Sequence, residues 1–118
     1  MSTKLNDITI GRDVSFRITF QDADENEVPI VGDTIWFTAK SDIELADSSA
    51  EIHTSYAVPN DVNGNAGIAI VPIADTETAN LADGITYVYA FTWITAGGQK
   101  QDVISGEFEA KISVAKDL

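Results

Sequence analysis

The chain of 118 residues contains no cysteine, one histidine and three prolines. Without cysteine it forms no disulfide, and with a single histidine it cannot build a zinc site rich in nitrogen or sulfur ligands. A hydrophobic core must therefore hold the fold together, and a chain of this length can bury one of sufficient size. We expect a single domain over residues 1–118.

Basic residues are scarce: seven Lys and Arg stand against nineteen Asp and Glu, for a net charge of −12. Such a surface repels phosphate backbones and anionic lipid, so we expect neither a nucleic-acid nor a membrane partner. The acidity suits solubility, a basic partner surface or a salty habitat equally well. Composition does not choose among these three interpretations.

Long hydrophobic runs are absent too. The start, Met1 to Asp7, has no apolar stretch behind Lys4, so we expect no secretory signal, and no later segment is long enough to cross a bilayer. These features predict that the protein is made in a host cytoplasm. They leave open whether cell lysis later releases it, because lysis needs no signal.

Alternation of apolar and polar residues is the main structural signal. It is cleanest at Val14, Phe16, Ile18 and Phe20. The predicted strands are Asp7 to Ile10, Val14 to Phe20, Thr34 to Lys40, Glu51 to Val58, Gly67 to Ile73, Tyr87 to Thr95, and a last strand that ends in Phe108 to Val114. In the last of these, Phe108, Ala110, Ile112 and Val114 are expected to face the core. An aromatic residue of the third strand is expected to fill the centre.

The predicted connections are a polar turn at Gln21 to Glu27, an extended crossing segment at Val28 to Asp33, a surface loop with room for a helical turn at Ser41 to Ala50, a turn at Ala96 to Gln99, a type I′ hairpin turn centred on Asn63-Gly64, and a short helical crossover from Asp75 to Leu81. Asp75 is the predicted N-cap of that crossover, because its side chain suits the first turn of a helix.

Leu81, Gly84 and Tyr87 have the spacing of a tyrosine corner. In this motif a tyrosine at the start of a late strand hydrogen-bonds back to the preceding crossover, and it is typical of two-sheet sandwiches. With about seven strands and no long amphipathic helix, the sequence predicts an all-β, immunoglobulin-like antiparallel β-sandwich with one short helical crossover.

Catalytic and metal motifs are weak. His53 is the only histidine and no Gly-x-Ser-x-Gly elbow is present, so we expect no enzyme. Asp22-x-Asp24-x-Asn26 and Asp61-x-Asn63-x-Asn65 have oxygen ligands at alternate positions, as calcium prefers. Neither run has the glycine and glutamate that complete an EF-hand loop, so we assign no metal and no cofactor.

An exposed aromatic platform would instead suit a module that binds carbohydrate or a cell-surface receptor. Its candidates are Trp36, Tyr56, Tyr87, Tyr89 and Trp93. Exposure of the two tryptophans would distinguish this alternative, because core residues cannot bind sugar.

Several blocks of the chain resemble the immunoglobulin-like N-terminal domain family of phage baseplate upper proteins. They are the turn and crossing segment from Asp22 to Gly32, the strand Ile35 to Lys40, the Asn-Gly hairpin into Gly67 to Ile70, the segment DTETANLADGITYVYAF and the final GGQKQDVISGEFEAKISV. The likeness covers nearly the whole chain, although the long fibre-assembling or receptor-binding portion that follows in the family is not in this sequence.

This resemblance implies a non-enzymatic structural role in a tailed-phage virion. The expected partners are other virion proteins in a symmetric homo- or hetero-oligomeric assembly, with docking on the tail, the baseplate or the head in many copies. The segments expected to dock are Met1 to Ile10, Ala115 to Leu118 and the loop from Ser41 to Ala50.

Overall fold

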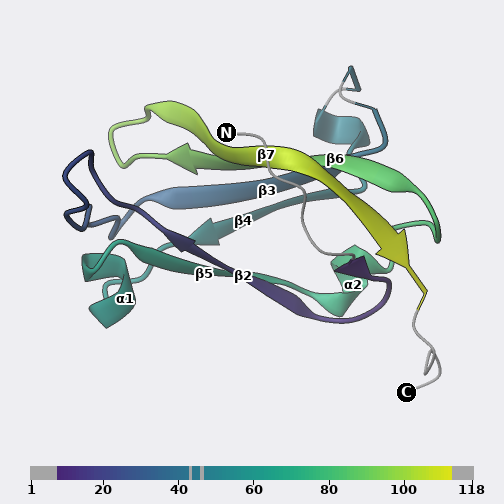
Figure 1. Ribbon diagram of the computed structural model, residues 1–118, viewed down its shortest axis with the longest axis horizontal. Helices are drawn as coiled ribbons and strands as arrows, with labels where there is room; N and C mark the ends of the chain where they lie inside the picture. The colour runs from purple at the N-terminus through teal and green to yellow at the C-terminus, as the bar shows by residue number, and fades with distance from the viewer. Residues whose placement is uncertain (1–7, 43, 46, 113–118) are drawn as a thin grey trace.

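In a computed structural model, residues 8–42, 44–45 and 47–112 are described, and they form a two-layered β-sandwich (Figure 1). The larger sheet has the strand order β1-β7-β6-β3-β4, and β2 pairs with β5 in the smaller one. The strands are β1 (Ile8–Thr9), β2 (Val14–Thr19), β3 (Thr34–Lys40), β4 (Ile52–Ala57), β5 (Ile68–Ile73), β6 (Thr86–Ile94) and β7 (Lys100–Lys111). The all-β, immunoglobulin-like prediction is confirmed.

The larger sheet is mixed rather than purely antiparallel, which corrects one detail of the prediction. β1 runs parallel to β7, with Ile8 opposite Ala110, whereas the other strand pairs are antiparallel. Parallel neighbours need a long connection, and here the rest of the sandwich supplies it between the first strand and the last.

The core lies between the two sheets and is built on phenylalanine. Phe37, Phe91 and Phe108 are fully buried. From the opposite layer, the ring of Phe16 stacks on Phe37 with centroids 5.5 Å apart and meets Phe91 edge-on at 5.3 Å. Alternation along each strand turns these side chains inward, so the predicted central aromatic of the third strand is Phe37.

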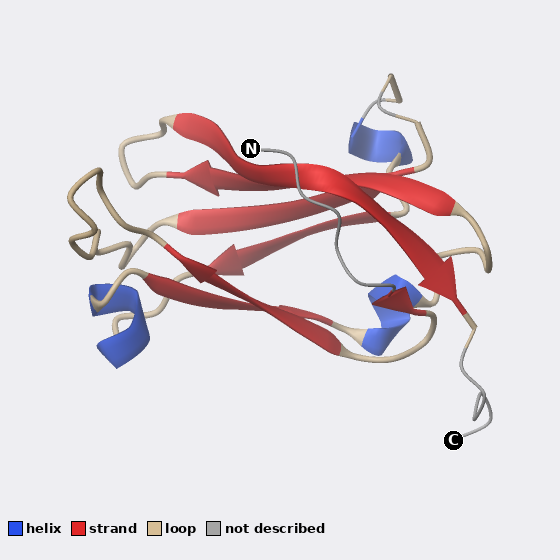
Figure 2. Ribbon diagram, in the orientation of Figure 1, coloured by secondary structure: helices blue, strands red, loops and turns tan. Residues whose placement is uncertain are grey.

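Two short helices and a 3-10 turn connect the strands: α1 (Val62–Asn65), α2 (Asp75–Thr78) and η1 (Asp47–Ser49). Figure 2 shows α1 and α2 at opposite ends of the sandwich. η1 lies within the predicted surface loop, and α2 lies within the predicted crossover.

The hairpin turn predicted at Asn63-Gly64 is wrong, because these residues belong to α1. The Asp61 side chain caps this helix by accepting a hydrogen bond from Gly64 N–H at 2.8 Å. β4 and β5 lie in different sheets, so the chain must cross between layers here rather than reverse within one. Gly67, directly before β5, takes the positive φ (77°) that a type I′ turn would have placed at Asn63 and Gly64.

The N-cap of α2 also differs from the prediction. The capping position is Ala74, and Asp75 makes no capping bond with its own side chain. The carboxylate of Asp13 instead accepts a hydrogen bond from Asp75 N–H at 2.7 Å. A residue 62 positions earlier therefore supplies the oxygen that a local cap would have provided.

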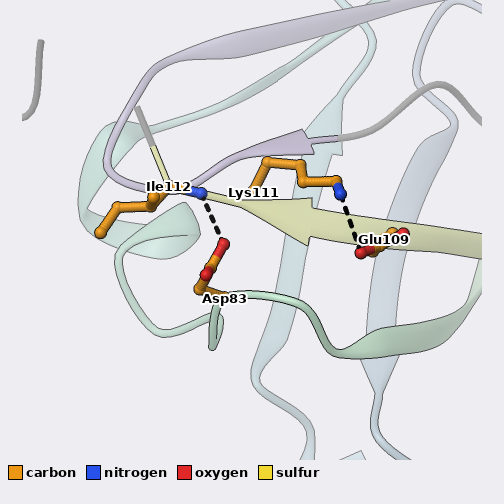
Figure 3. Close-up of polar contacts among 4 residues, drawn as sticks. All are labelled: Asp83, Glu109, Lys111 and Ile112. Carbon is orange, nitrogen blue, oxygen red and sulfur yellow. Dashed lines mark hydrogen bonds and ion pairs between the residues drawn. The ribbon is translucent and has the colours of Figure 1, made fainter. Parts of the chain in front are cut away.

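β7 ends at a polar clamp (Figure 3). Ile112 N–H donates to the Asp83 carboxylate at 2.9 Å, and Lys111 pairs with Glu109 at 3.0 Å. The side chain of Ile112 is 54% exposed, so its predicted place in the core is wrong. The chain has already left the sheet at this point, while Val114 lies outside the described residues.

Candidate interaction surface

Leu81, Gly84 and Tyr87 come together at the start of β6. Leu81 and Tyr87 are buried, and Gly84 has a positive φ of 77°. Ala82 N–H donates to the Tyr87 hydroxyl at 2.8 Å, which is the hydrogen bond of a tyrosine corner. These three residues hold the crossover against the strand and leave no side chain for binding.

The five aromatic residues considered for a sugar platform are dispersed. Tyr87 and Tyr89 are buried in the core, and Tyr56 packs against its edge. Trp93 turns inward, with its ring 4.9 Å from that of Phe20 and its indole N–H donating to the Asp33 carboxylate at 2.8 Å. These four residues therefore support the sandwich rather than an exposed cluster.

Trp36 is the aromatic of that group on the outer face of the larger sheet. It stacks on His53 of the adjacent strand, with ring centroids 4.4 Å apart and planes at 21°. The His53 Nδ1 lies 3.0 Å from the Thr38 hydroxyl. Its hydrogen-bond partner is thus a threonine and not a carboxylate, an arrangement that does not make a Ser-His-Asp triad.

In each of the two calcium-like runs, the carboxylate of the first aspartate accepts hydrogen bonds from backbone N–H groups of its own loop. Asp22 Oδ1 accepts hydrogen bonds from the backbone N–H groups of Asp24 and Asn26, both at 2.9 Å. Asp61 caps α1. Across residues 8–42, 44–45 and 47–112, no group of three or more potential ligands is placed to hold a metal ion.

Asp33 was not singled out by any sequence pattern. It is only 8% exposed, and its carboxylate accepts from both the Trp93 indole and Ala96 N–H, at 2.8 and 2.9 Å. It therefore ties the crossing segment to the end of β6. A carboxylate whose two donors lie 60 and 63 residues later in the chain cannot be identified from local sequence.

A shallow hollow of about 530 Å³ lies on the outer face of the larger sheet. Small residues such as Ala90 and Gly106 line it, together with charged Lys40, Asp102 and Glu107. Thr92 donates to Asp102 at 2.8 Å, and the Lys40 ammonium donates to the Leu45 carbonyl at 2.7 Å. These groups suit polar contacts with a partner.

One end of the sandwich, which we call the acidic end, carries only negative charge in its loops. It is formed by the β2–β3 loop, the segment around α1 and the β6–β7 turn (Figure 1, left). Asp22, Asp24, Glu25, Glu27 and Asp61 are all exposed there. The stretches 20–33 and 58–67 contain no lysine or arginine. Lys100 directly follows the uncharged turn 95–99, but the carboxylates of the other two stretches outnumber it, so this end attracts basic surfaces.

The segments expected to dock are only partly described. Of Met1 to Ile10, the structure describes Ile8–Ile10, which include the two residues paired with β7. Ala115 to Leu118 lies outside the described residues. In the loop from Ser41 to Ala50, the described residues include η1 and Leu45, whose carbonyl binds Lys40.

Neither the protein-family models nor the curated proteins contain a match to this chain. Among the described residues, no helix is long and apolar enough to cross a membrane. The class that fold and surface define is an immunoglobulin-like β-sandwich with an acidic end.

Proposed function

We propose that this chain is a non-enzymatic accessory structural protein of a tailed-phage virion. It docks in multiple copies on the tail, the baseplate or the head, against other virion proteins in a symmetric assembly. The observation that carries the proposal is the acidic end, where exposed carboxylates from separate loops gather on a two-layered scaffold. Charge of one sign on a surface favours fast and selective association with a basic partner.

The arrangement of polar side chains also supports a structural role. Asp33, Asp61, Asp83 and Asp13 each bind backbone or indole N–H groups, so these carboxylates hold the fold. The resemblance to the baseplate upper protein domain supplies the phage context, because members of that family serve as mounting pieces.

Cryo-electron microscopy of purified phage particles from cells that carry this gene tests the proposal. Ordered density for the sandwich, repeated with the symmetry of the tail or the head shell, is the expected result and would decide between the two locations. Particles made after disruption of the gene are the control and should lack that density. Absence of the chain from every particle would overturn the proposal.

A carbohydrate- or receptor-binding module is the second candidate, and one observation favours it. The Trp36–His53 stack lies on the outer face of the larger sheet, where a sugar ring could contact it. A glycan array with the unmodified chain and with Trp36→Ala tests this role. Binding that requires Trp36 would support it, and an array without a hit would exclude the sugars presented.

A further inference from the structure

A second hollow, which we call the seam groove, opens between the two sheets at the acidic end. Its volume is about 390 Å³. Its apolar lining comes from Ile18, Phe20, Val28, Trp93, Val103 and Ile104. β1 pairs with β7 at Ala110 and Lys111, toward the opposite end of the seam, and none of its residues lines the groove.

The wall on the side of the larger sheet owes its apolar character to an irregularity in β7. The pairing of β6 with β7 shifts between Phe91 and Thr92, so that Ile104 is opposite Phe91 and Asp102 is opposite Thr92. Val103 is the extra residue of this bulge. A bulge redirects a side chain, and here Val103 and Ile104 both line the groove beside Trp93.

The opposite wall is the edge of β2. β2 has β5 as its hydrogen-bonded neighbour in the described sheet, which leaves its other edge facing the groove. A strand edge of this kind accepts an extended segment through backbone hydrogen bonds, while alternate side chains of that segment enter pockets. Phe20, Val28, Trp93 and Val103 would then receive an apolar side chain.

Negative charge around the groove favours a partner segment that carries basic residues. Gln21 and Val28 line it, and the residues between them include Asp22, Asp24 and Glu27, all exposed. Arg17 contributes a positive charge to the lining, but the carboxylates of this loop outnumber it. A second copy of the chain is a poor occupant, because each copy has a net charge of −12 and the two repel.

We propose that the seam groove binds an extended segment of a partner protein in which apolar residues alternate with lysine or arginine. The apolar residues enter between β2 and β7, and the basic residues face the carboxylates of the β2–β3 loop. This inference deepens the docking function proposed above, because it names the chemistry of the partner and the place where it binds.

Trp93 reports on the groove directly. Trp36→Phe leaves it as the one tryptophan of the chain, since the sequence has two. The probe is a short synthetic peptide in which lysine and leucine alternate, and the control peptide has glutamate in place of lysine. We expect the first peptide to change Trp93 emission saturably and less strongly as sodium chloride is added, and the second to leave it unchanged.

Two groove variants with matched controls locate the binding. Val103→Asn removes apolar surface from the groove and should weaken binding about tenfold, whereas Val62→Asn makes the same change at the exposed tip of α1 and should have no effect. Asp24→Lys should also weaken binding, while Glu44→Lys changes the net charge equally on another loop. Should Val103→Asn fail to fold, as judged by circular dichroism, Asp24→Lys still decides the outcome.

An unchanged Trp93 signal with the lysine peptide would overturn the proposal, and so would equal losses in the groove variants and their controls. Concentration-dependent dimerisation abolished by Val103→Asn in sedimentation would identify a second copy as the occupant instead. Co-sedimentation with phage particles separates the two levels of inference. If the chain binds particles but the groove variants bind equally well, the groove proposal fails alone; if the peptide binds and particles do not, the virion role fails alone.

Discussion

At the scale of single residues, buried hydroxyls and carboxylates hold connections against strands. Thr78 is fully buried, and its hydroxyl donates to the Arg12 carbonyl at 2.8 Å. Tyr87 accepts from Ala82 N–H, and Asp33 accepts from Trp93 and Ala96. Each of these bonds has at least one partner in a connection between strands, so removal of one should loosen a connection and not a sheet.

Tyr87→Phe tests the tyrosine corner. The phenylalanine keeps the ring in the core but removes the oxygen that Ala82 N–H contacts at 2.8 Å. We expect the free energy of unfolding to fall by about 1 to 2 kcal/mol, since a partly buried donor loses its acceptor. Urea denaturation measures the change. Tyr56→Phe, with the same loss of a hydroxyl at a half-buried position, is the control, and an equal effect there would argue against a special role for the corner.

Tyr89 should make the free energy of unfolding depend on pH in the alkaline range. Burial raises the pKa of its phenol above the ordinary value of 10.0, because the charged form is desolvated. As the pH rises past about 10, the Tyr89 phenol loses its proton in the unfolded state before it does so in the folded state. Its contribution to the free energy of unfolding is therefore complete below about pH 10 and is lost as the pH rises further. Urea denaturation across this range should show stability falling, and Tyr89→Phe should reduce the slope. An unchanged slope would contradict the assignment.

At the scale of elements, α2 shows how a distant residue can replace a local cap. Asp13→Ala removes the carboxylate that accepts from Asp75 N–H at 2.7 Å and should cost about 1 kcal/mol of unfolding free energy, as other N-caps do. Asp75→Ala is the matched control and should cost less, because its side chain makes no capping bond. Thermal unfolding of both variants measures the difference, and the reverse order would restore Asp75 as the cap.

In α1, tight packing around position 64 restricts which residue can stand there. Gly64 is buried, and a Cβ there would lie 2.6 Å from the Pro59 carbonyl oxygen and 3.0 Å from a Val31 methyl. Gly64→Ala should therefore destabilise the chain by about 1 to 3 kcal/mol, although alanine favours helix. Asn63→Ala, at an exposed position of the same helix, is the control. A stabilised Gly64→Ala variant in chemical denaturation would contradict the packing described.

At the scale of the whole molecule, charge opposes the compact state. Nineteen acidic residues against seven basic ones leave a net charge of −12, and folding brings these charges together. We expect added sodium chloride to raise the unfolding free energy at neutral pH by on the order of 1 kcal/mol, because screening shortens the range of repulsion. An equal gain with an uncharged solute at the same osmolality would attribute the effect to something other than charge.

The strands were predictable from the sequence because their signal is local. Alternate residues of a strand face opposite sides, so Ile35, Phe37 and Ala39 show their burial in their spacing alone. The same holds for the acidic loops and for the tyrosine at the start of β6. These features depend on neighbours in the chain, and the sequence by itself determined them together with the fold class.

Tertiary structure alone decided the rest, because it depends on residues that meet only after folding. The separation of β4 and β5 into different sheets made Asn63-Gly64 helical. The pairing of β2 with β5, in which Val14 is opposite Ile73, brought Asp13 beside Asp75 at one end of the smaller sheet. The candidate site likewise combines features that the sequence predicts with features that only the folded structure shows. Its carboxylates are visible in the sequence, but the seam groove exists only where β2, the bulge of β7 and Trp93 come together in space.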